Sequence, residues 1–292
     1  PLALAAAFHG ADHGAPQAAS ELLAIASDPE RPAIVRAAAI DRLGSMPSEG
    51  MLSIVRKGLS DPDDMVRHAS LSSLEALPPE QRLPLAAPLL RDPRRIVRIE
   101  AARVLAPVPD SAMNSADRGA FLLAAGELEA SHRLNADQAE SVTALASFQR
   151  NRGQIQEAEA ALRRVVQAEP DFVPAWVNLA DLLRSTGQEA EAETVLRKGI
   201  SHVPDAAALH HSLGLSLVRQ RRLAEALPEL EAATRGRGTT TRYSYVYAIA
   251  LHSAGRSKDA LAILDAQLKQ RPGDRELMQA RESVVRESSS GR

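Results

Sequence analysis

Apolar positions recur every 34 residues through the second half of the chain, four times and without a gap, between residues 139 and 272. Alanine and leucine hold equivalent positions four residues apart, and leucine or tyrosine marks the first half of each unit. The equivalent positions are Ala158, Ala192, Ala226 and Ala260; Leu162, Leu196, Leu230 and Leu264; and Leu145, Leu179, Leu213 and Tyr247. A fixed period of this length predicts an all-α fold, an α-solenoid of stacked helix pairs.

Turn-forming residues punctuate the same four units. Glycine lies at the middle turn of three units and proline closes three, with one replacement in each series. The middle residues are Gly153, Gly187, Arg221 and Gly255, and the closing residues are Pro170, Pro204, Gly238 and Pro272. The polar, glycine-rich segment 235–242 predicts a loosened or longer turn after the third unit.

A looser repeat with a spacing of 31 residues precedes this array. Each Asp-Pro pair is a helix start, because Asp caps free N–H groups and Pro loses nothing at the first helical position. The motifs are Asp28-Pro29, Asp61-Pro62 and Asp92-Pro93, followed by Val35-Arg36, Val66-Arg67 and Val97-Arg98, and amphipathic segments precede them at 17–27, 48–59 and 80–90. The pattern predicts three helix pairs within residues 17–108.

The remaining segments flank or join the two arrays. Residues 1–16 are expected to form a short apolar helix that ends at Gly10, followed by a frayed end. Residues 109–138 are expected to form a linker and a joining helix, from about 117 to 133, that caps the second array. Residues 273–292 are expected to form a capping helix, to about residue 287, and then a disordered tail.

Two local features interrupt these patterns. His9 and His13 lie four residues apart, the spacing that places two metal ligands on one helix face, but the neighbouring glycines favour a frayed end. Pro84 falls in the first turn of its expected helix, whereas Pro88 is interior and should bend or end that helix.

Composition narrows the range of functions. The net charge is −2, so no general attraction to nucleic acid or to an anionic membrane follows. The chain has no cysteine, which excludes disulfides, thiolate catalysis and cysteine-ligated metals. No apolar run approaches the roughly 20 residues that span a bilayer. The sequence begins at Pro1 without Met, so we expect a processed protein or a fragment of a longer one.

The two periods resemble two known repeat families. The 31-residue pattern, with its DPxxVR-type motifs, resembles HEAT repeats in their short bacterial form. The 34-residue pattern resembles tetratricopeptide repeats, whose signature is most complete in unit 173–206, with Trp176, Leu179, Gly187, Ala192 and Pro204. These resemblances imply HEAT-like helical hairpins followed by a right-handed tetratricopeptide superhelix.

The HEAT resemblance assigns a role to the regularly spaced charges of the first array. In that family, Asp and Arg form a ladder that caps helices and ties neighbouring repeats together. Carried over, the ladder residues are Asp28, Asp61, Asp92, Arg36, Arg67 and Arg98. The alternative is an arginine row that binds carboxylates or phosphates of a partner.

The tetratricopeptide resemblance implies an inner groove lined by the first helix of each pair. Its predicted partner-binding residues are Arg150, Asn178, Asp181, Arg184, His211, Arg219, Arg242 and Tyr245, with Thr143, Ser147, Val177, Leu215, Val218, Ile249 and His252 beside them. The four arginines give the groove a basic bias. It is expected either to bind a protein or peptide partner or to be an ordinary solvated surface.

The order of the arrays is similar to the C-terminal half of bacterial multihaem cytochrome c proteins that carry both kinds of repeat. Segments such as PAIVRAAAIDRL and PAWVNLADLLRSTG carry this resemblance. It implies a periplasmic protein, and an accessory or docking region for haem held elsewhere, because the sequence has no CxxCH motif. Our first interpretation is a non-enzymatic scaffold that binds a protein partner through the groove of the second array, and the cytochrome docking region is the alternative.

Catalytic signatures are missing from the sequence. It contains no HExxH, GxSxG or GxxxxGK[ST] motif and no strand-borne GxGxxG motif. We therefore expect no enzymatic activity, no catalytic residues, no cofactor and no metal in this segment. The expected partner is a protein or peptide, without nucleic-acid binding or membrane insertion.

Overall fold

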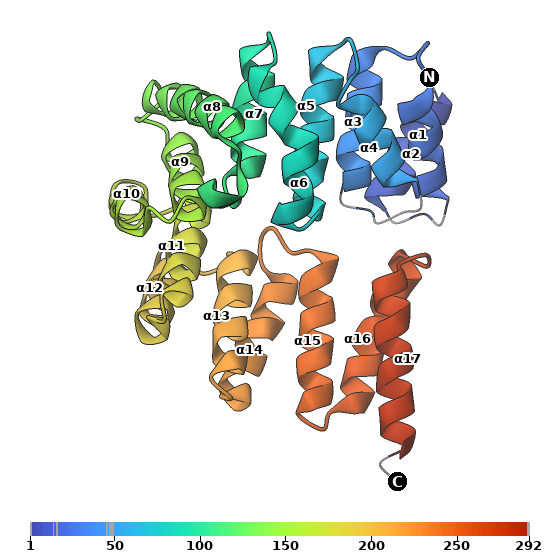
Figure 1. Cartoon of the computed structure of the whole chain (residues 1–292). Coiled ribbons are helices and arrows are strands. Elements are labelled where there is room, and N and C mark those ends of the chain that lie inside the picture. The colour runs from blue at the N-terminus through green and yellow to red at the C-terminus, as the bar shows by residue number, and fades with distance from the viewer. Residues whose placement is uncertain (1, 14, 16, 45, 47–49, 291–292) are drawn as a thin grey trace. The chain divides into compact units, whose positions relative to one another are not determined.

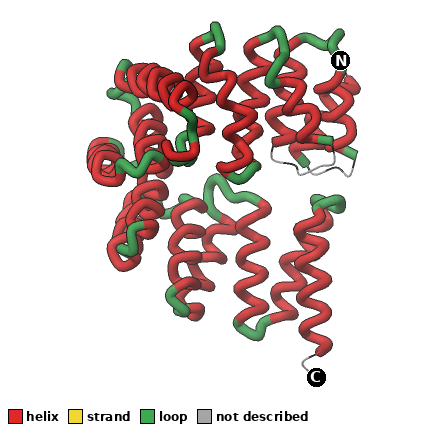
Figure 2. The backbone as a smooth tube through the Cα atoms, in the orientation of Figure 1, coloured by secondary structure: helices red, strands yellow, loops and turns green. Residues whose placement is uncertain are grey.

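The structure, a computed structural model, is built from helices. It describes residues 2–13, 15, 17–44, 46 and 50–290. Over these ranges it contains seventeen α-helices and three short 3₁₀ helices, and one isolated bridge joins Ala206 and Arg237. Figure 2 shows the helices connected by loops. The fold is thus the α-solenoid that the repeats predict. Backbone contacts divide the chain into two units, Pro1–Ala136 with Asn151–Gly153, and Asp137–Arg150 with Gln154–Arg292.

The first unit contains three stacked helix pairs, flanked by one helix at each end (Figure 1). Its elements are α1 (Leu2–Asp12), α2 (Ala18–Ser27), α3 (Ala33–Gly44), α4 (Met51–Gly58), α5 (Asp64–Ser73), η1 (Leu74–Ala76), α6 (Pro79–Ala86), η2 (Ala87–Arg91), α7 (Arg95–Leu105), η3 (Asp110–Ala112) and α8 (Ser115–Arg133). α2 packs on α3, α4 on α5 and α6 on α7, and the second helices α3, α5 and α7 pack on one another. Apolar residues at helical spacing, such as Ile40, Leu43, Leu71 and Leu105, are at most 1% exposed in this core.

The N-terminal helix corrects one expectation. α1 continues past Gly10 to Asp12, and Arg42 of α3 donates a hydrogen bond to Asp12 at 3.0 Å. The Arg42 guanidinium also lies 4.7 Å from the centroid of the Phe8 ring. These contacts offset the low helix propensity of glycine, so the expected end at Gly10 is wrong. Residues 1, 14 and 16 lie outside the described residues.

Proline ends the first helix of the third pair, as predicted. α6 stops at Ala86, and Pro88 lies in the following 3₁₀ helix η2. Because α6 begins at Pro79, Pro84 lies inside the helix and not in its first turn, which corrects the expected register.

α8 belongs to the first unit, where it packs on α7 and η2. It begins at Ser115, and the Asn114 side chain accepts a hydrogen bond from the Asp117 N–H at 2.8 Å. Phe121 and Leu128 are at most 1% exposed. α8 thus covers one side of the third HEAT-like pair, and its predicted role as a cap of the second array stays a prediction.

An arginine–carboxylate ladder connects the successive pairs of this unit. Arg36 pairs with Asp61, Arg67 with Asp92 at 2.7 Å, and Arg98 with Glu127 of α8 at 2.6 Å. Asp61 and Asp92 also accept hydrogen bonds from the N–H groups two residues further on, at 3.0 and 2.8 Å. Each aspartate therefore orders the turn before its own helix and binds the preceding repeat. The helices begin later than the Asp-Pro pairs predict, at Ala33, Asp64 and Arg95, and α5 is capped by Asp63, which accepts a hydrogen bond from the Met65 N–H.

Two positions differ from the simple ladder. Asp28 pairs locally with Arg31 at 3.1 Å. At the other end, Glu127 takes the place of an aspartate. Burial alone would raise the pKa of Asp61, but hydrogen bonds from Arg36 and from the Asp63 N–H hold it below its usual value. The charged form of the ladder is thus the favoured one.

We predict that Arg67→Ala lowers the free energy of unfolding by about 3 kcal/mol, because it leaves a buried carboxylate unpaired. The Asp92 side chain is only 7% exposed beside Arg67, so this carboxylate depends on the guanidinium more than a surface carboxylate would. Arg31→Ala is the matched control, since the Arg31–Asp28 pair is solvent-exposed and should cost at most about 0.5 kcal/mol. Urea unfolding followed by circular dichroism measures both, and equal losses would contradict the ladder's role.

The second unit contains four helix pairs and a closing helix. Its elements are α9 (Ala139–Asn151), α10 (Ile155–Ala168), α11 (Val173–Ser185), α12 (Glu189–His202), α13 (Ala207–Arg219), α14 (Leu223–Arg235), α15 (Thr241–Ser253), α16 (Ser257–Gln270) and α17 (Arg275–Ser290). The repeated alanines and leucines of the second helices lie in the core, each at most 2% exposed. At Gly214, a Cβ atom would come within 2.5 Å of the Leu230 side chain, so the third pair needs glycine to pack this closely.

The middle turn of every pair uses a left-handed backbone conformation. Gly153, Gly187 and Gly255 have φ angles of 77°, 80° and 79°. Arg221 occupies the equivalent position with φ = 62° and is the only non-glycine residue with positive φ among the described residues. The repeat geometry thus imposes on Arg221 a conformation that costs an L-residue about 1–2 kcal/mol.

The turn after the third pair is longer by one residue, as predicted. Five residues separate α14 from α15, whereas four separate α10 from α11 and α12 from α13. Arg237 donates its N–H to the Asp205 carbonyl at 2.6 Å and accepts from the Ala207 N–H at 3.1 Å. A Cβ atom at Gly236 would lie 2.7 Å from the Asp205 oxygen, so glycine permits this backbone contact.

The C-terminal helix is also longer than expected. α17 runs from Arg275 to Ser290, so the predicted disordered tail is wrong for residues 288–290, and residues 291–292 lie outside the described residues. Leu277 and Val284 are 1% exposed and pack against the fourth pair. The Ser288 hydroxyl donates to the Val284 carbonyl at 2.6 Å, which continues the last turn.

Replacing Arg221 by glycine should stabilise the second unit. Relief of the left-handed strain outweighs the extra chain entropy of glycine, so Arg221→Gly should raise the free energy of unfolding by about 0.5–1 kcal/mol. The reciprocal change Gly187→Arg should lower it by a similar amount. Thermal and urea unfolding test both, and a destabilised Arg221→Gly variant would contradict the strain.

Candidate partner-binding face

The first helices of the four pairs, α9, α11, α13 and α15, present a shared surface, called here the first-helix face. Contacts join these helices in sequence. The Asn178 amide of α11 lies 3.4 Å from the Ser147 hydroxyl of α9, and α13 packs on α11. The Tyr243 ring of α15 stacks on His211 of α13 with 4.2 Å between the ring centroids. The face therefore crosses all four repeats.

Four arginines lie on this face, one in each repeat. Arg184 pairs with Asp181 of the same helix and Arg219 with Glu189, both at 3.5 Å, while Arg242 reaches Glu276 of α17 at 3.8 Å. Arg150 is half-buried and makes no ion pair or hydrogen bond with any described residue. These long or absent pairings leave the guanidinium groups able to bind another group.

Two of the residues predicted for the groove are not accessible. His211 is 9% exposed beneath Tyr243, and Thr143 is 6% exposed. Their Nδ1 and Oγ1 atoms are buried without a hydrogen-bond partner. His211 lies on the first helix of its repeat, α13, as predicted, but Tyr243 of the neighbouring helix α15 covers its ring. His211 is therefore part of the interior and not a direct contact for a partner.

The other predicted residues are at least partly accessible. Asn178, Asp181 and Tyr245 are half-buried, and Val218 is 38% exposed. His252 is held by Ser257 and Glu287, each at 2.9 Å. Tyr243 also belongs to this face, although we did not predict it from the sequence. Its only sequence signal is the alternation of three tyrosines, Tyr243, Tyr245 and Tyr247, in one helix.

The pKa of His211 is lowered to about 4, first because burial disfavours the charged ring and second because Arg242 is positive. The imidazole is therefore neutral at physiological pH. The positive charge of the face comes from its arginines.

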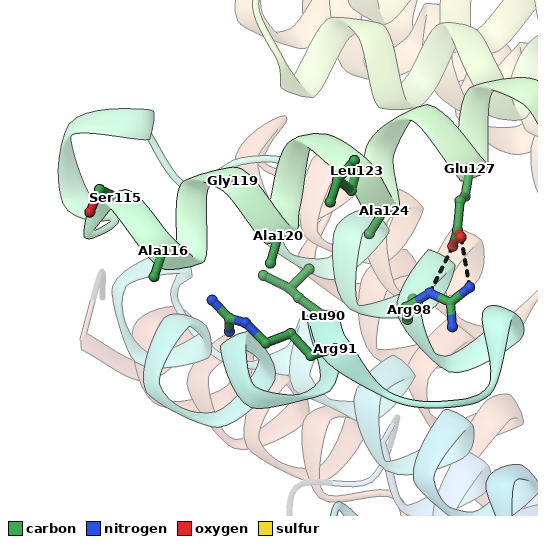
Figure 3. Close-up of a pocket in the computed structure, with 10 residues that line it drawn as sticks. All are labelled: Leu90, Arg91, Arg98, Ser115, Ala116, Gly119, Ala120, Leu123, Ala124 and Glu127. Carbon is green, nitrogen blue, oxygen red and sulfur yellow. Dashed lines mark hydrogen bonds and ion pairs between the residues drawn. The ribbon is translucent and has the colours of Figure 1, made fainter.

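A cleft of about 610 Å³ lies in the first unit, between α8 and the η2–α7 segment (Figure 3). Small residues of α8, including Ala116, Gly119 and Ala120, line it opposite Leu90 and Arg91. The Arg98–Glu127 pair closes one end, and Leu123 is 76% exposed at its edge. The cleft is chiefly apolar, and its arginines are already paired with carboxylates.

The described residues contain no group of three or more histidine, aspartate or glutamate residues placed to hold a metal ion. No helix in the described part of the chain is long and apolar enough to cross a membrane.

Comparison with protein families identifies both arrays. The HEAT repeats model matches residues 2–75 and 19–106, and two tetratricopeptide repeat models match residues 149–214 and 211–275. The chain contains HEAT repeats followed by tetratricopeptide repeats. Both repeat resemblances are thereby confirmed, whereas the resemblance to multihaem cytochromes is not addressed by these matches.

Solved structures similar to this chain include two that are described as tetratricopeptide repeat proteins. TTC0263 of Thermus thermophilus is 23% identical over 57% of this chain and 91% of its own, with a TM-score of 0.46. YrrB, described as having an unusual peptide-binding site, is 17% identical over 56% and 84%, with a TM-score of 0.43. MamA from Desulfovibrio magneticus RS-1 is 18% identical over 54% and 89%, with a TM-score of 0.42. Likenesses at this level carry no information about function, and a comparison with curated proteins found no significant match.

The buried His211 should make the second unit sensitive to acid. Its pKa is lower in the folded chain, about 4, than in the unfolded chain, about 6.5, so the unfolded state binds more protons between these values. Protonation of His211 in the unfolded chain should therefore lower the free energy of unfolding by about 2 kcal/mol when the pH falls from 7.5 to 5.

The variant His211→Gln cannot take up this proton and should lose that part of the pH dependence. Urea unfolding of both proteins at the two pH values measures the difference. An identical pH dependence in wild type and variant would show that His211 does not titrate as its burial requires.

Proposed function

We propose that the chain is a non-enzymatic interaction scaffold that binds a segment of a partner protein on the first-helix face. Tetratricopeptide repeats generally bind protein or peptide partners, and HEAT and tetratricopeptide repeats are generally not catalytic. What supports this face in particular is its composition. Incompletely buried apolar side chains lie among weakly paired arginines along four repeats.

The apolar component of the face comes from the same helices. Val177, Leu215 and Ile249 are half-buried, and Val218 is 38% exposed, although their helices α11, α13 and α15 also carry buried core residues. A partner segment would remove this apolar surface from water, at about 25 cal/mol per Å². The side chains that supply hydrogen bonds, such as Asn178, lie beside them.

The second repeat provides a matched test of this proposal. The first double variant, Asn178→Ala with Arg184→Glu, changes the first helix α11. The control, Thr194→Ala with Arg197→Glu, likewise removes one polar side chain and reverses one arginine charge, but on the second helix α12. All four positions are at least partly accessible, so both variants should keep the helical content. We expect the α11 variant to lose proteins that the wild type captures from the source organism's extract, and the α12 variant to retain them.

Quantitative mass spectrometry of the captured proteins reads the result. If only the α11 variant loses captured proteins, the first-helix face is supported as the binding site. We expect the affinity for the partner to fall at least about tenfold, or 1.4 kcal/mol. Equal capture by both variants, or loss only in the α12 variant, contradicts it.

The expected association with a multihaem cytochrome and the expected periplasmic location stay predictions from the sequence resemblance. No contact or side-chain arrangement among the described residues favours them over a free-standing scaffold. The absorption spectrum of the natural full-length protein tests the first, because bound haem gives an intense Soret band.

A further inference from the structure

We infer that the partner segment is an extended, acidic one, and that it crosses the first three repeats along the row formed by Arg150, Arg184 and Arg219. This inference rests on the proposed function, because it specifies what the first-helix face binds. The three arginines occupy the last turns of α9, α11 and α13, 34 and 35 residues apart. They therefore lie at the same end of three neighbouring helices.

Charge is distributed unequally between the two layers of helices in this unit. The first helices α9, α11, α13 and α15 carry four arginines and two carboxylates, a formal charge of +2. The second helices α10, α12, α14 and α16 carry seven basic and ten acidic residues, a formal charge of −3. The net charge of the whole chain, −2, conceals this asymmetry. An anionic partner is attracted to the first-helix face and repelled by the opposite one.

The arginines of the two layers also differ in their ion pairs. On the second helices, Arg163 pairs with Glu159 at 2.8 Å and Arg197 with Glu193 at 2.9 Å. On the row, Arg184 and Arg219 have their carboxylates at 3.5 Å, and Arg150 has no partner among the described residues. Charge-assisted N–H···O bonds are about 2.7–2.9 Å long, so the row is not satisfied internally.

Arginine in the last turn of a helix also complements the helix dipole, and this is the plain structural explanation of the row. The dipole end is equivalent to about half a negative charge, whereas each guanidinium carries a full positive one. A surplus of positive charge therefore remains at each of the three helix ends.

The repeat spacing defines the form of the partner. Packed helices lie about 8–10 Å apart, and an extended chain advances about 3.3 Å per residue. Carboxylates on every third residue of an extended segment would therefore meet successive arginines. The residues between them would lie over Leu215 and Val218, the half-buried and exposed apolar side chains next to Arg219.

A peptide series tests this chemistry. The probe is a fluorescein-labelled synthetic peptide of about 12 residues, long enough to cross three repeats, with Glu at every third position and Ala, Ser and Leu between. The comparison peptides carry Gln or Lys at those positions. Fluorescence anisotropy at low salt, about 50 mM NaCl, and at about 300 mM gives the affinities. We expect the Glu peptide to bind more tightly than either comparison peptide and to weaken in high salt.

The protein offers a control with the same charge change in the same three repeats. Arg150→Gln, Arg184→Gln and Arg219→Gln together remove the row. Arg163→Gln, Arg197→Gln and Arg235→Gln remove one arginine from each second helix, α10, α12 and α14. We expect the Glu peptide to bind the first triple variant about tenfold more weakly than wild type, and the second triple variant as well as wild type.

The alternative outcomes separate the two proposals. If both triple variants bind the Glu peptide equally weakly, the attraction is non-specific, and the inference that the arginine row binds the partner is wrong. If the Gln peptide binds as tightly as the Glu peptide, the inference of an acidic partner is wrong, but the first-helix face can still be the binding site. Failure of the Glu peptide to bind would overturn the acidic partner too. None of these peptide results tests the proposed function itself, which the capture of natural partners by the α11 and α12 variants tests separately.

Discussion

The close approach of two helices within each repeat is the constraint on which the second unit depends. An isolated pair buries too little apolar surface to be stable, so every pair has to bury one side against its own partner helix and another against the next pair. Alanine at 158, 192, 226 and 260 permits that approach, and Gly214 permits it where Leu230 fills the space. The same closeness forces a left-handed middle turn. Arg221 shows how strongly the packing dictates the backbone, because an arginine adopts there the conformation that glycine adopts in the other three pairs.

The first unit meets the same constraint with charge as well as packing. Its ladder arginines bind carboxylates of the following pair or of α8, and Asp61 and Asp92 also accept hydrogen bonds from the turns before their own helices. Such pairs are favourable only where hydrogen bonds satisfy both partners, which is the case for Asp92 with Arg67 and the Arg94 N–H. The ladder thus fixes the register between repeats. The arginines of the first-helix face are different, since their carboxylates lie too far away to satisfy them.

Most of the fold follows from the periodicity of the sequence, because repeated positions have repeated environments. The four pairs of the second unit, the three pairs of the first and the end of α6 before Pro88 were all predictable on this basis. The errors came where tertiary contacts override local preference. Arg42 and Phe8 hold α1 together through Gly10. The position of His211 on its helix was predictable, but its burial was not, because the covering ring belongs to Tyr243 of the next repeat. The length of α17 likewise depended on contacts that no local signal records.

The account of function depends on one claim, that a partner contacts the first helices of the second unit. Hydrogen–deuterium exchange of the chain with and without its captured natural partner measures this most directly. The account predicts slower exchange on binding at the ends of α9, α11 and α13, around residues 147–151, 181–186 and 215–220, with α10, α12 and α14 unchanged. Protection confined to the second helices, or to the HEAT repeats, would contradict it.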